Sequence, residues 1–595
     1  MIDTHAPRLD VLRTQISKTS HDGYLVPMAD EFQSEYVPNS ARRIEFLSGF
    51  TGSAGFIIVL KDKAAFFTDG RYTLQAAQQI NRDLFQIFDI SDKTPSAWLS
   101  ETLTAGQKIA YDPWLHTASE IDRLQKAVEK AAAHLEAVDG NLVDTIWTDR
   151  PAPPTAPIEP YDLRYAGISS ADKRQRIAED LKKHKLSAAV LTDPTSIAWL
   201  LNIRGGDVPN TPLPLSFAIL HDDSHVAWFV DSAKLTPALP AHLGDDVDIC
   251  PINGFLNALA QLSQAPNPIR IDSSESAIKV VQHLKQSGVT IAEGDDPCVL
   301  PKACKNTTEV DGMRAAHQRD AVALVQFLYW LDHNVASSTV TELSAEARLA
   351  EFRHLRPLYR GPSFDTIAGC GPHGAIVHYR ATPQTNRVLE LGQMFLLDSG
   401  GQYLDGTTDV TRTMILGNPT PEMRDRFTRV LKGHIALAAI RFPKGTTGGE
   451  LDVLARQHLW ATGLDYSHGT GHGVGSYLGV HEGPQAISKR SKVPLQPGMV
   501  VSNEPGFYKS GEYGIRIENL QVVVLQPDIT LPERTMYGFE SLTLVPIDRR
   551  LIDPALLTEP ERVWLNAYHV RVYDALQAEL DSDTLAWLTA ATAPI

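Results

Sequence analysis

Five side chains that commonly bind metal ions stand in the second half of the chain. They are Asp398, Asp409, His472, Glu504 and Glu518. Asp398 ends an apolar run, and Glu504 precedes Pro505, which forces an extended backbone on it. An ionised carboxylate in a buried sheet is costly unless another charge compensates it. For either aspartate taken alone, a solvated sheet face is an equally good interpretation.

Taken together, the four carboxylates need compensating charge. Like charges about 4 Å apart repel by roughly 4 kcal/mol per pair at an effective dielectric constant near 20. Two divalent cations would neutralise the four negative charges. An oxygen-rich set with one imidazole is typical of sites in which two metal ions share and deprotonate a water. The set therefore indicates a hydrolytic centre with two metals.

The imidazole of the set comes from a glycine-rich stretch, 468–475, in which four of eight residues are glycine. That content excludes a helix, so His468 and His472 are not the helical pair of a zinc site. The stretch also fails the G-x-G-x-x-G pattern, which argues against a phosphate-binding loop. A histidine in such a loop is otherwise more often structural or exposed.

The elements that must hold these residues are predicted to be antiparallel strand pairs. Residues 394–398 form a short apolar strand, Gly400-Gly401 a turn, and 407–416 the returning strand. A second pair is predicted at 499–502 and 514–525.

Alternation in the last of these strands places Arg516 and Glu518 on one face and Ile515 and Ile517 on the other. If the isoleucines enter the core, Glu518 faces the opposite layer.

Helical patterns are expected on both sides of this region. A long amphipathic helix is predicted from about 309 to 332, opened by the cap-like Thr307-Thr308-Glu309. Two more are predicted at 559–577 and 582–589.

The N-terminal half has a different organisation. In both 8–28 and 171–193, an amphipathic helix leads into an apolar strand, which indicates two related α/β modules. Five prolines between 151 and 160 mark a boundary between them. A second boundary is predicted near 300–308. Neither module carries a nucleotide-binding motif.

Composition narrows the class of protein. The chain has 595 residues, of which 43% are apolar and 21% charged, as in globular proteins with several domains. Its net charge of −16 disfavours nucleic acid and anionic membranes as partners. No apolar run reaches the roughly 18 residues of a membrane span. Four cysteines without C-x-x-C spacing indicate a reducing compartment, so a cytoplasmic protein is predicted.

The joint pattern resembles a known family. The five residues, with His468-Gly-Thr-Gly-His472, Asn503-Glu504-Pro505-Gly506 and Ile517-Glu518-Asn519, match the ligand pattern of the pita-bread metallopeptidases. The flanking sequence resembles the three-domain, cytosolic-type aminopeptidase P group. Its additional matches are 33–36, 52–55, 68–72, His378-Tyr379, the stretch 481–484 and the Tyr568-His569 region.

The resemblance implies a fold with both α/β and α+β parts. It predicts a creatinase-like domain I at 1–155, a creatinase-like domain II at 160–303, a pita-bread catalytic domain at 305–545 and a C-terminal extension at 546–595.

The resemblance also implies a reaction: hydrolysis of the N-terminal Xaa–Pro bond of peptides whose second residue is proline. Asp409 and Glu518 would bridge two metal ions, Asp398 would complete one site, and His472 with Glu504 the other. Glu504 would also act as general base. The family favours manganese and a homodimer.

Further residues are predicted to serve the substrate. His378 and His481 would orient it and assist the reaction, and His468 would shape the proline pocket. Arg516 would hold a neighbouring carboxylate or contact substrate. Arg71 would reach the substrate, and an interdomain salt bridge is an equally good interpretation of it.

Three alternatives stay open. Prolidase uses the same five ligands but cuts only dipeptides, and its resemblance would not cover the additional module at 161–300. Pita-bread domains also serve as binding modules in chromatin chaperones, and a third possibility is a creatinase-like, metal-free hydrolase. The last two lose metal ligands that this chain keeps.

Overall fold

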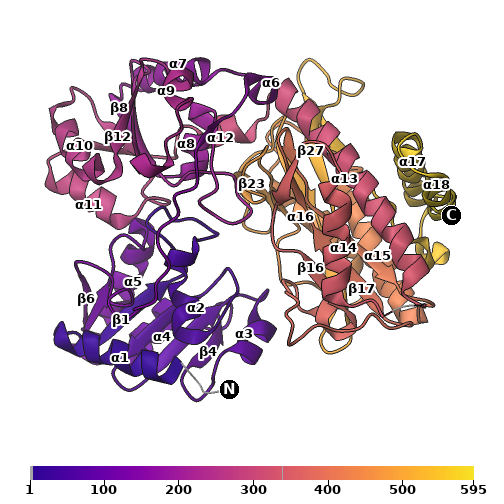
Figure 1. The fold of residues 1–595 in the computed structure, drawn as a ribbon, viewed down its shortest axis with the longest axis horizontal. Coiled ribbons are helices and arrows are strands. Elements are labelled where there is room, and N and C mark those ends of the chain that lie inside the picture. The colour runs from indigo at the N-terminus through magenta and orange to yellow at the C-terminus, as the bar shows by residue number, and fades with distance from the viewer. Residues whose placement is uncertain (1–4, 338) are drawn as a thin grey trace. The chain divides into compact units, whose positions relative to one another are not determined.

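The computed structural model describes residues 5–337 and 339–595, which divide into two compact units (Figure 1). Unit 1 contains the chain up to residue 161 together with 168–298. Unit 2 contains 162–167 and 299–595. In the described residues, no helix is long and apolar enough to cross a membrane.

The first half of unit 1 is a six-stranded sheet in the order β4-β3-β2-β1-β5-β6. Its strands are β1 (Gly23–Pro27), β2 (Phe56–Leu60), β3 (Ala64–Thr68), β4 (Gln86–Asp89), β5 (Lys108–Tyr111) and β6 (His134–Ala137). Its helices are α1 (His5–Lys18), α2 (Arg43–Ser48), α3 (Thr73–Gln79), α4 (Pro95–Thr102) and α5 (Ala118–Lys130). The central strands β1, β2 and β3 are buried along their whole length. Apolar clusters pack on both faces, as expected for a sheet covered by helices.

The second half of unit 1 repeats this topology, with strand order β12-β11-β10-β8-β13-β14. Its strands are β8 (Ala188–Leu191), β10 (Phe217–His221), β11 (Val226–Val230), β12 (Val247–Pro251), β13 (Ile269–Ile271) and β14 (Ile291–Glu293). Its helices are α7 (Ser170–Lys183), α8 (Pro194–Leu201), α9 (Leu239–Leu243), α10 (Phe255–Gln261) and α11 (Ile278–Gln286). In both sheets two antiparallel pairs sit beside parallel pairs in the same positions. The prediction of two related α/β modules is confirmed.

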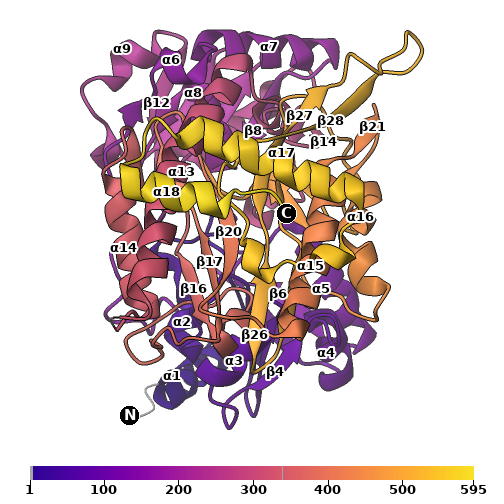
Figure 2. The same cartoon turned by 90° about the vertical axis from the view of Figure 1, so that its right-hand side faces the viewer.

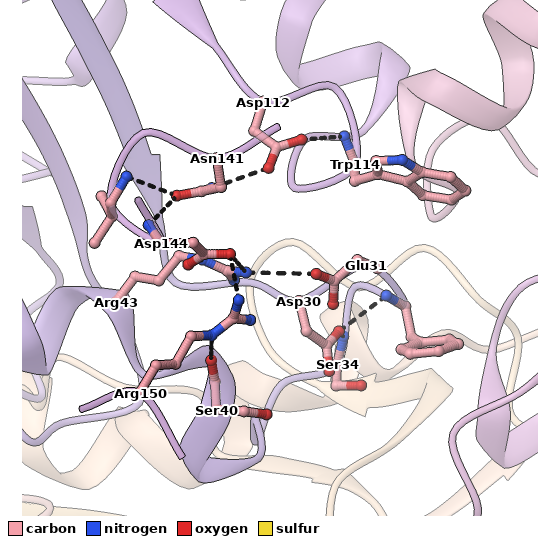
Figure 3. Close-up of polar contacts among 12 residues, drawn as sticks. Asp30, Glu31, Ser34, Ser40, Arg43, Asp112, Trp114, Asn141, Asp144 and Arg150 are labelled. Carbon is pink, nitrogen blue, oxygen red and sulfur yellow. Dashed lines mark hydrogen bonds and ion pairs between the residues drawn. The ribbon is translucent and has the colours of Figure 1, made fainter. Parts of the chain in front are cut away.

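Two groups of buried charges in unit 1 are paired. Arg43, which is 1% exposed, donates two hydrogen bonds to Asp144 at 2.8 and 2.9 Å, and Asp144 also pairs with Arg150 (Figure 3). In the second module, Lys234 lies 2.6 Å from Asp207, with both side chains buried. These pairs satisfy the requirement that a buried charge be compensated.

In unit 2, helices surround three antiparallel sheets of three or more strands and one two-stranded pair. Its helices before the C-terminal region are α6 (Leu163–Ala166), α12 (Val299–Ala303), α13 (Thr307–Asn334), α14 (Glu342–His354), α15 (Pro421–Ala438) and α16 (Gly448–Trp460). Helix α13 starts with a capping box, in which Asn306 and Glu309 exchange hydrogen bonds. The predicted long helix is therefore confirmed, one turn longer than expected in total.

Two of these sheets hold the residues of interest, in the orders β16-β17-β20 and β21-β28-β27-β24-β22-β23. Their strands are β16 (Ile367–Cys370), β17 (Met394–Ser399), β20 (Val410–Ile415), β21 (Arg441–Pro443), β22 (Gly471–Gly473), β23 (Glu482–Ile487), β24 (Val500–Asn503), β27 (Asn519–Leu525) and β28 (Met536–Ser541). Shorter strands complete the unit: β15 (Tyr359–Pro362), β18 (Gly401–Tyr403), β19 (Gly406–Thr407), β25 (Gly506–Lys509) and β26 (Tyr513–Arg516).

The C-terminal helices α17 (Glu559–Leu576) and α18 (Ser582–Ala591) pack on unit 2 (Figure 2). Leu565, Val572 and Leu588 are fully buried and join a large apolar cluster, which also holds residues of α13 and β20. The predicted helices at 559–577 and 582–589 are confirmed.

The predicted strand pairs are present but interrupted. Gly400 does not make the turn after β17, because β18 continues from Gly401 and the chain turns at 404–405. A Cβ at Gly400 would lie 2.0 Å from the carbonyl oxygen of Thr408, so close backbone approach explains this glycine. The strand predicted at 407–416 splits into β19 and β20, and the one at 514–525 splits into β26 and β27.

Candidate metal centre

The five predicted ligands come from the strands of unit 2 and from the breaks between them. Asp398 lies in β17 and His472 in β22. Asp409 lies between β19 and β20, Glu504 between β24 and β25, and Glu518 between β26 and β27. In two of these breaks the backbone N–H leaves the ladder: that of Glu504 donates to Thr470 O at 2.8 Å, and that of Glu518 to Thr411 O at 3.2 Å. Each of the three breaks thus places a carboxylate of the predicted ligand set between two strands.

The structure brings these residues into one buried cluster. Donor atoms of Asp409, His472 and Glu518 all lie within 4.8 Å of one another. His472 Nε2 lies 3.4 Å from Asp409 Oδ2 and 3.6 Å from Glu504 Oε1. Asp398, Asp409 and Glu518 are 7%, 4% and 1% exposed, so water does little to separate their charges.

The buried, crowded carboxylates favour protons. Burial, together with the charges of Asp409 and Glu504, raises the pKa of Asp398 to about 7 against the opposing effect of Arg516. Burial and the neighbouring carboxylates raise the pKa of Glu518 well above its ordinary value. Burial acts to lower the pKa of His472, but Asp409 and Glu504 raise it to about 9. The cluster on its own therefore carries more negative charge than its surroundings stabilise.

Other side chains orient the carboxylates. Arg516, 1% exposed, donates to Asp398 Oδ2 at 2.6 Å. Thr411 Oγ donates to Glu518 Oε2 at 2.7 Å, and Ser502 Oγ lies 3.1 Å from Glu504 Oε1. Such hydrogen bonds fix one oxygen of each group and leave the other available to a cation.

The donor set fits two divalent metal ions. Asp398 Oδ1 is buried and has no hydrogen-bond partner among the described residues, as expected for an atom that needs a cation. His472 Nδ1 lies 2.9 Å from the carbonyl oxygen of Gly473, which makes it the donor and leaves the lone pair of Nε2 available to a metal ion. Four carboxylates and one imidazole form the oxygen-rich set that dinuclear hydrolytic sites use.

The histidines predicted to serve the substrate lie in the same unit. The rings of His481 and His472 are 4.3 Å apart between centroids, at an angle of 73°. His468 Nε2 lies 2.9 Å from Tyr508 Oη. Tyr508 in turn accepts from Arg516 Nη1 at 2.7 Å, so a hydrogen-bonded path runs from His468 to Asp398. The sequence analysis did not predict a role for Tyr508, because its position four residues after Glu504 was the one available signal.

The segment that carries His378 is held by another residue that the sequence did not reveal. Glu342, fully buried, accepts from the backbone N–H of Cys370 at 2.8 Å and of Arg387 at 3.0 Å. It also accepts from Tyr379 Oη at 3.0 Å and lies 2.8 Å from His373 Nδ1. One carboxylate on α14 thus fixes both ends of the loop 370–387 that contains His378.

Arg71 belongs to unit 1, where Asp69 is its partner. Its Nε and Nη2 donate to the two oxygens of Asp69 at 2.9 and 2.7 Å, and its side chain is 27% exposed. The guanidinium lies 5.4 Å from the centre of the Tyr72 ring. Its predicted contact with substrate stays a prediction.

Models of known families match most of the chain. Creatinase/prolidase N-terminal domain models match residues 8–145 and 149–309. The metallopeptidase family M24 model matches 311–524, and the model of the C-terminal region of peptidase M24 matches 535–595.

Full-length relatives give a finer placement. Proteins named "Probable Xaa-Pro aminopeptidase P" from Paracoccidioides brasiliensis and Aspergillus fumigatus are each 40% identical to this chain. The alignments cover 100% of both chains in the first case, and 99% of this chain and 92% of the relative in the second. The crystal structure of an X-prolyl aminopeptidase from Caenorhabditis elegans, described as a cytosolic enzyme with a di-nuclear active site, superimposes with a TM-score of 0.94 at 36% identity and full coverage of both chains.

Two creatinase-type modules, an M24 domain and a buried acidic cluster define a metallopeptidase. Within that class, the chain belongs to the Xaa-Pro aminopeptidase P family. The predicted fold class is confirmed.

Proposed function

We propose that this chain removes the first residue from peptides whose second residue is proline, with two divalent metal ions. One observation carries the proposal: a complete set of four carboxylates and one imidazole is gathered in unit 2, three of its members with donor atoms within 4.8 Å of one another. The full-length likeness to Xaa-Pro aminopeptidases supplies the substrate class.

The residues that would hold the ions are Asp398, Asp409, His472, Glu504 and Glu518, of which Asp409 and Glu518 would serve both. When bound, the ions neutralise the cluster, polarise the scissile carbonyl and activate a water. Glu504, the least buried of the carboxylates, is the general base that takes up the water's proton. Arg516 holds Asp398 in place through its 2.6 Å contact.

His378 and His481 are the proposed groups that orient the substrate and protonate the prolyl nitrogen as it leaves. His468, held by Tyr508, borders the proline pocket. An Xaa–Pro bond has no N–H and a restricted conformation. Attack by an activated water does not require that N–H, which suits this cluster to the bond.

Three finer properties are part of the proposal. Manganese is the physiological metal, in keeping with the oxygen-rich donor set. The protein is a homodimer, as its family resemblance implies. It acts in the cytoplasm, a proposal supported by the similar Caenorhabditis elegans enzyme, which is described as cytosolic. The domain limits given above, at 155, 160, 303, 305 and 545, are proposed for this chain as well.

The test is a rate comparison on Xaa–Pro dipeptides and Xaa–Pro–Yaa peptides, with protein stripped of metal by chelation and then supplied with Mn²⁺. We expect release of the first residue from the longer peptides only after metal is restored. Matched peptides with alanine in place of proline should be cleaved far more slowly. Full activity after thorough chelation would contradict a metal-dependent reaction.

Prolidase is the second candidate, because it shares the five ligands. The module at 161–300 argues against it, since a dipeptidase needs only one N-terminal module in addition to the catalytic domain. If dipeptides alone are hydrolysed, prolidase is the correct assignment.

A further inference from the structure

Next to His481, unit 2 buries three charged side chains that the mechanism above does not use. Glu482 contacts Lys305 through Oε1, and Lys302 Nζ lies 3.5 Å from its Oε2. The side chains of Lys302, Lys305 and Glu482 are 5%, 1% and 3% exposed. Both oxygens of one carboxylate are thus held by ammonium groups, which leaves the side chain little freedom to rotate.

Stability alone does not account for this triad. Buried ion pairs contribute little to stability, and apolar residues of similar volume often stabilise a fold as well or better. A triad with two cations and one anion is a still less favourable choice for that purpose. Its location is what distinguishes it, because Glu482 follows His481 directly in sequence and begins β23.

Strand pairing connects Glu482 to the segment that carries His472. Glu482 is paired with Gly473, the residue after His472, and the register of β22 and β23 shifts between His472 and Gly473. A Cβ at Gly473 would lie 2.0 Å from the carbonyl oxygen of Glu482. At a β-bulge the regular hydrogen-bond ladder is disrupted and does not fix the register. The contacts that hold Glu482 in β23 therefore also help to fix the position of the paired strand β22.

The lysines reach this point from a segment far away in sequence. Lys305 is separated from Glu482 by 177 positions, and α12, which holds Lys302, packs on β23 (Figure 1). The N–H of Lys305 donates to Gly498 O at 3.1 Å, just before β24, the strand that leads to Glu504. The segment 302–305 therefore contacts the elements that carry both His481 and Glu504.

We propose that Lys302 and Lys305 are positioning residues, which act through Glu482 to hold His481 against His472 at the metal centre. The proposal rests on the function proposed above and adds to it a part of the chain outside the metal-binding strands. In this arrangement, the two lysines contribute to the reaction through their contacts with Glu482.

The experiment compares Glu482→Gln, Lys305→Met and the double variant, as metal-loaded full-length protein. Steady-state kinetics on an Xaa–Pro–Yaa peptide give kcat and KM. A second readout needs no activity: the rate at which diethyl pyrocarbonate modifies His481, measured by peptide mass spectrometry. Lys234→Met, which breaks a buried lysine–carboxylate pair in unit 1, is the matched control.

We expect Glu482→Gln to lower kcat by about 10- to 100-fold, the range typical of residues that orient ligands, with KM changed little. Lys305→Met should have a smaller effect, because Lys302 still pairs with Glu482. In the Glu482→Gln background, Lys305→Met should add almost nothing, since its partner is already lost. His481 should be modified at a changed rate in both single variants and at an unchanged rate in Lys234→Met.

Two results would overturn the proposal: effects on kcat that multiply in the double variant, or an unchanged modification rate of His481 in every folded variant. If the wild-type protein does not cleave Xaa–Pro peptides, the proposed function fails, but the modification rates still decide whether the triad positions His481. Should Glu482→Gln not fold, Lys302→Met, which removes the longer of the two contacts with Glu482, allows the same comparison.

Discussion

Both units bury charged side chains to a similar depth, but two ion-paired groups of unit 1 are balanced and the four-carboxylate cluster of unit 2 is not. In unit 1, Asp207 has Lys234 at 2.6 Å, and Asp144 lies between Arg43 and Arg150. In unit 2, four carboxylates share one cluster, where Arg516 pairs with Asp398 and the hydroxyls of Thr411 and Ser502 contact two others. Burial alone therefore does not mark a functional site. A surplus of one sign of charge does, because the fold stabilises it only when a ligand supplies the rest.

The largest expected effect comes from removing a carboxylate of the uncompensated cluster. Glu518→Gln takes away a proposed ligand to both ions, so kcat/KM should fall by at least about a thousandfold. Metal analysis of the purified protein should show fewer than the two ions per chain expected for the wild type. Asp207→Asn, a carboxylate change at equal depth in unit 1, is the control and should leave metal content unchanged.

Normal activity and metal content in Glu518→Gln would contradict the idea that the surplus charge of the cluster marks a metal site. The surplus charge in unit 2 would then have no function in metal binding.

The next effect concerns stability and comes from the balanced unit. Lys234→Met leaves Asp207 buried without its partner and should lower the free energy of unfolding by about 3–5 kcal/mol. The double variant Lys234→Met/Asp207→Leu should regain most of that loss, because an apolar pair replaces a compensated one. Urea denaturation, followed with a probe in unit 1, measures both changes. Activity per folded molecule should stay at the wild-type level, and a proportional fall in kcat would show that balanced charges also serve the reaction.

A third prediction uses a carboxylate in unit 1 that is buried but not ion-paired. Asp30 accepts the N–H groups of Phe32 and Ser34 through Oδ1, while Oδ2 is buried without a hydrogen-bond partner among the described residues (Figure 3). Burial, more than the opposing N–H of Ser34, raises its pKa to about 6. The folded state therefore keeps a proton that the unfolded state, with a pKa near 4, has lost.

The difference between the two pKa values sets the direction in which stability changes with pH. The stability that protonated Asp30 contributes is fully present below about pH 4 and is lost as pH rises through about 6. Asp30→Asn, which cannot ionise, should therefore gain stability relative to the wild type over this range, by up to about 3 kcal/mol. Unfolding free energies of both proteins at pH 4, 5, 6 and 7 measure it. A constant difference between them across the range would contradict a raised pKa.

The sequence predicts the parts of the site that follow a linear pattern. The types and spacing of Asp398, Asp409, His472, Glu504 and Glu518 indicated a two-metal centre, because two divalent cations would neutralise four such carboxylates. The two modules of unit 1 were predictable from their repeated order of helix and strand. Their identical strand order was not, because pairing between strands depends on contacts far apart in sequence.

The residues that support the site were missed for the same reason. Lys305 contacts Glu482 across 177 positions, and Glu342 holds a loop that begins 28 positions later. No local pattern connects such partners. The breaks at Asp409 and Glu518 were missed because alternation continues through them. At the second break, the backbone N–H of Glu518 nevertheless bonds to Thr411 O in another strand.

The smallest expected effect concerns Arg71, and it tests the comparison from the balanced side. Asp69 already satisfies this guanidinium with two hydrogen bonds, so the rule drawn from the two units makes Arg71 structural. The family resemblance instead predicts that it binds the peptide beyond proline.

A charge-assisted contact of this kind binds substrate and transition state about equally, so Arg71→Ala should raise KM more than it lowers kcat. The expected loss in kcat/KM is about 1–3 kcal/mol, increasing as the peptide lengthens past proline. Arg71→Lys keeps the charge without the paired geometry and should show an intermediate loss. Arg42→Ala, which breaks an exposed pair with Glu45 in the same module, is the control. Unchanged kinetics on dipeptides and longer peptides, with a lowered melting temperature, would make Arg71 a structural residue and extend the rule to the Arg71–Asp69 pair.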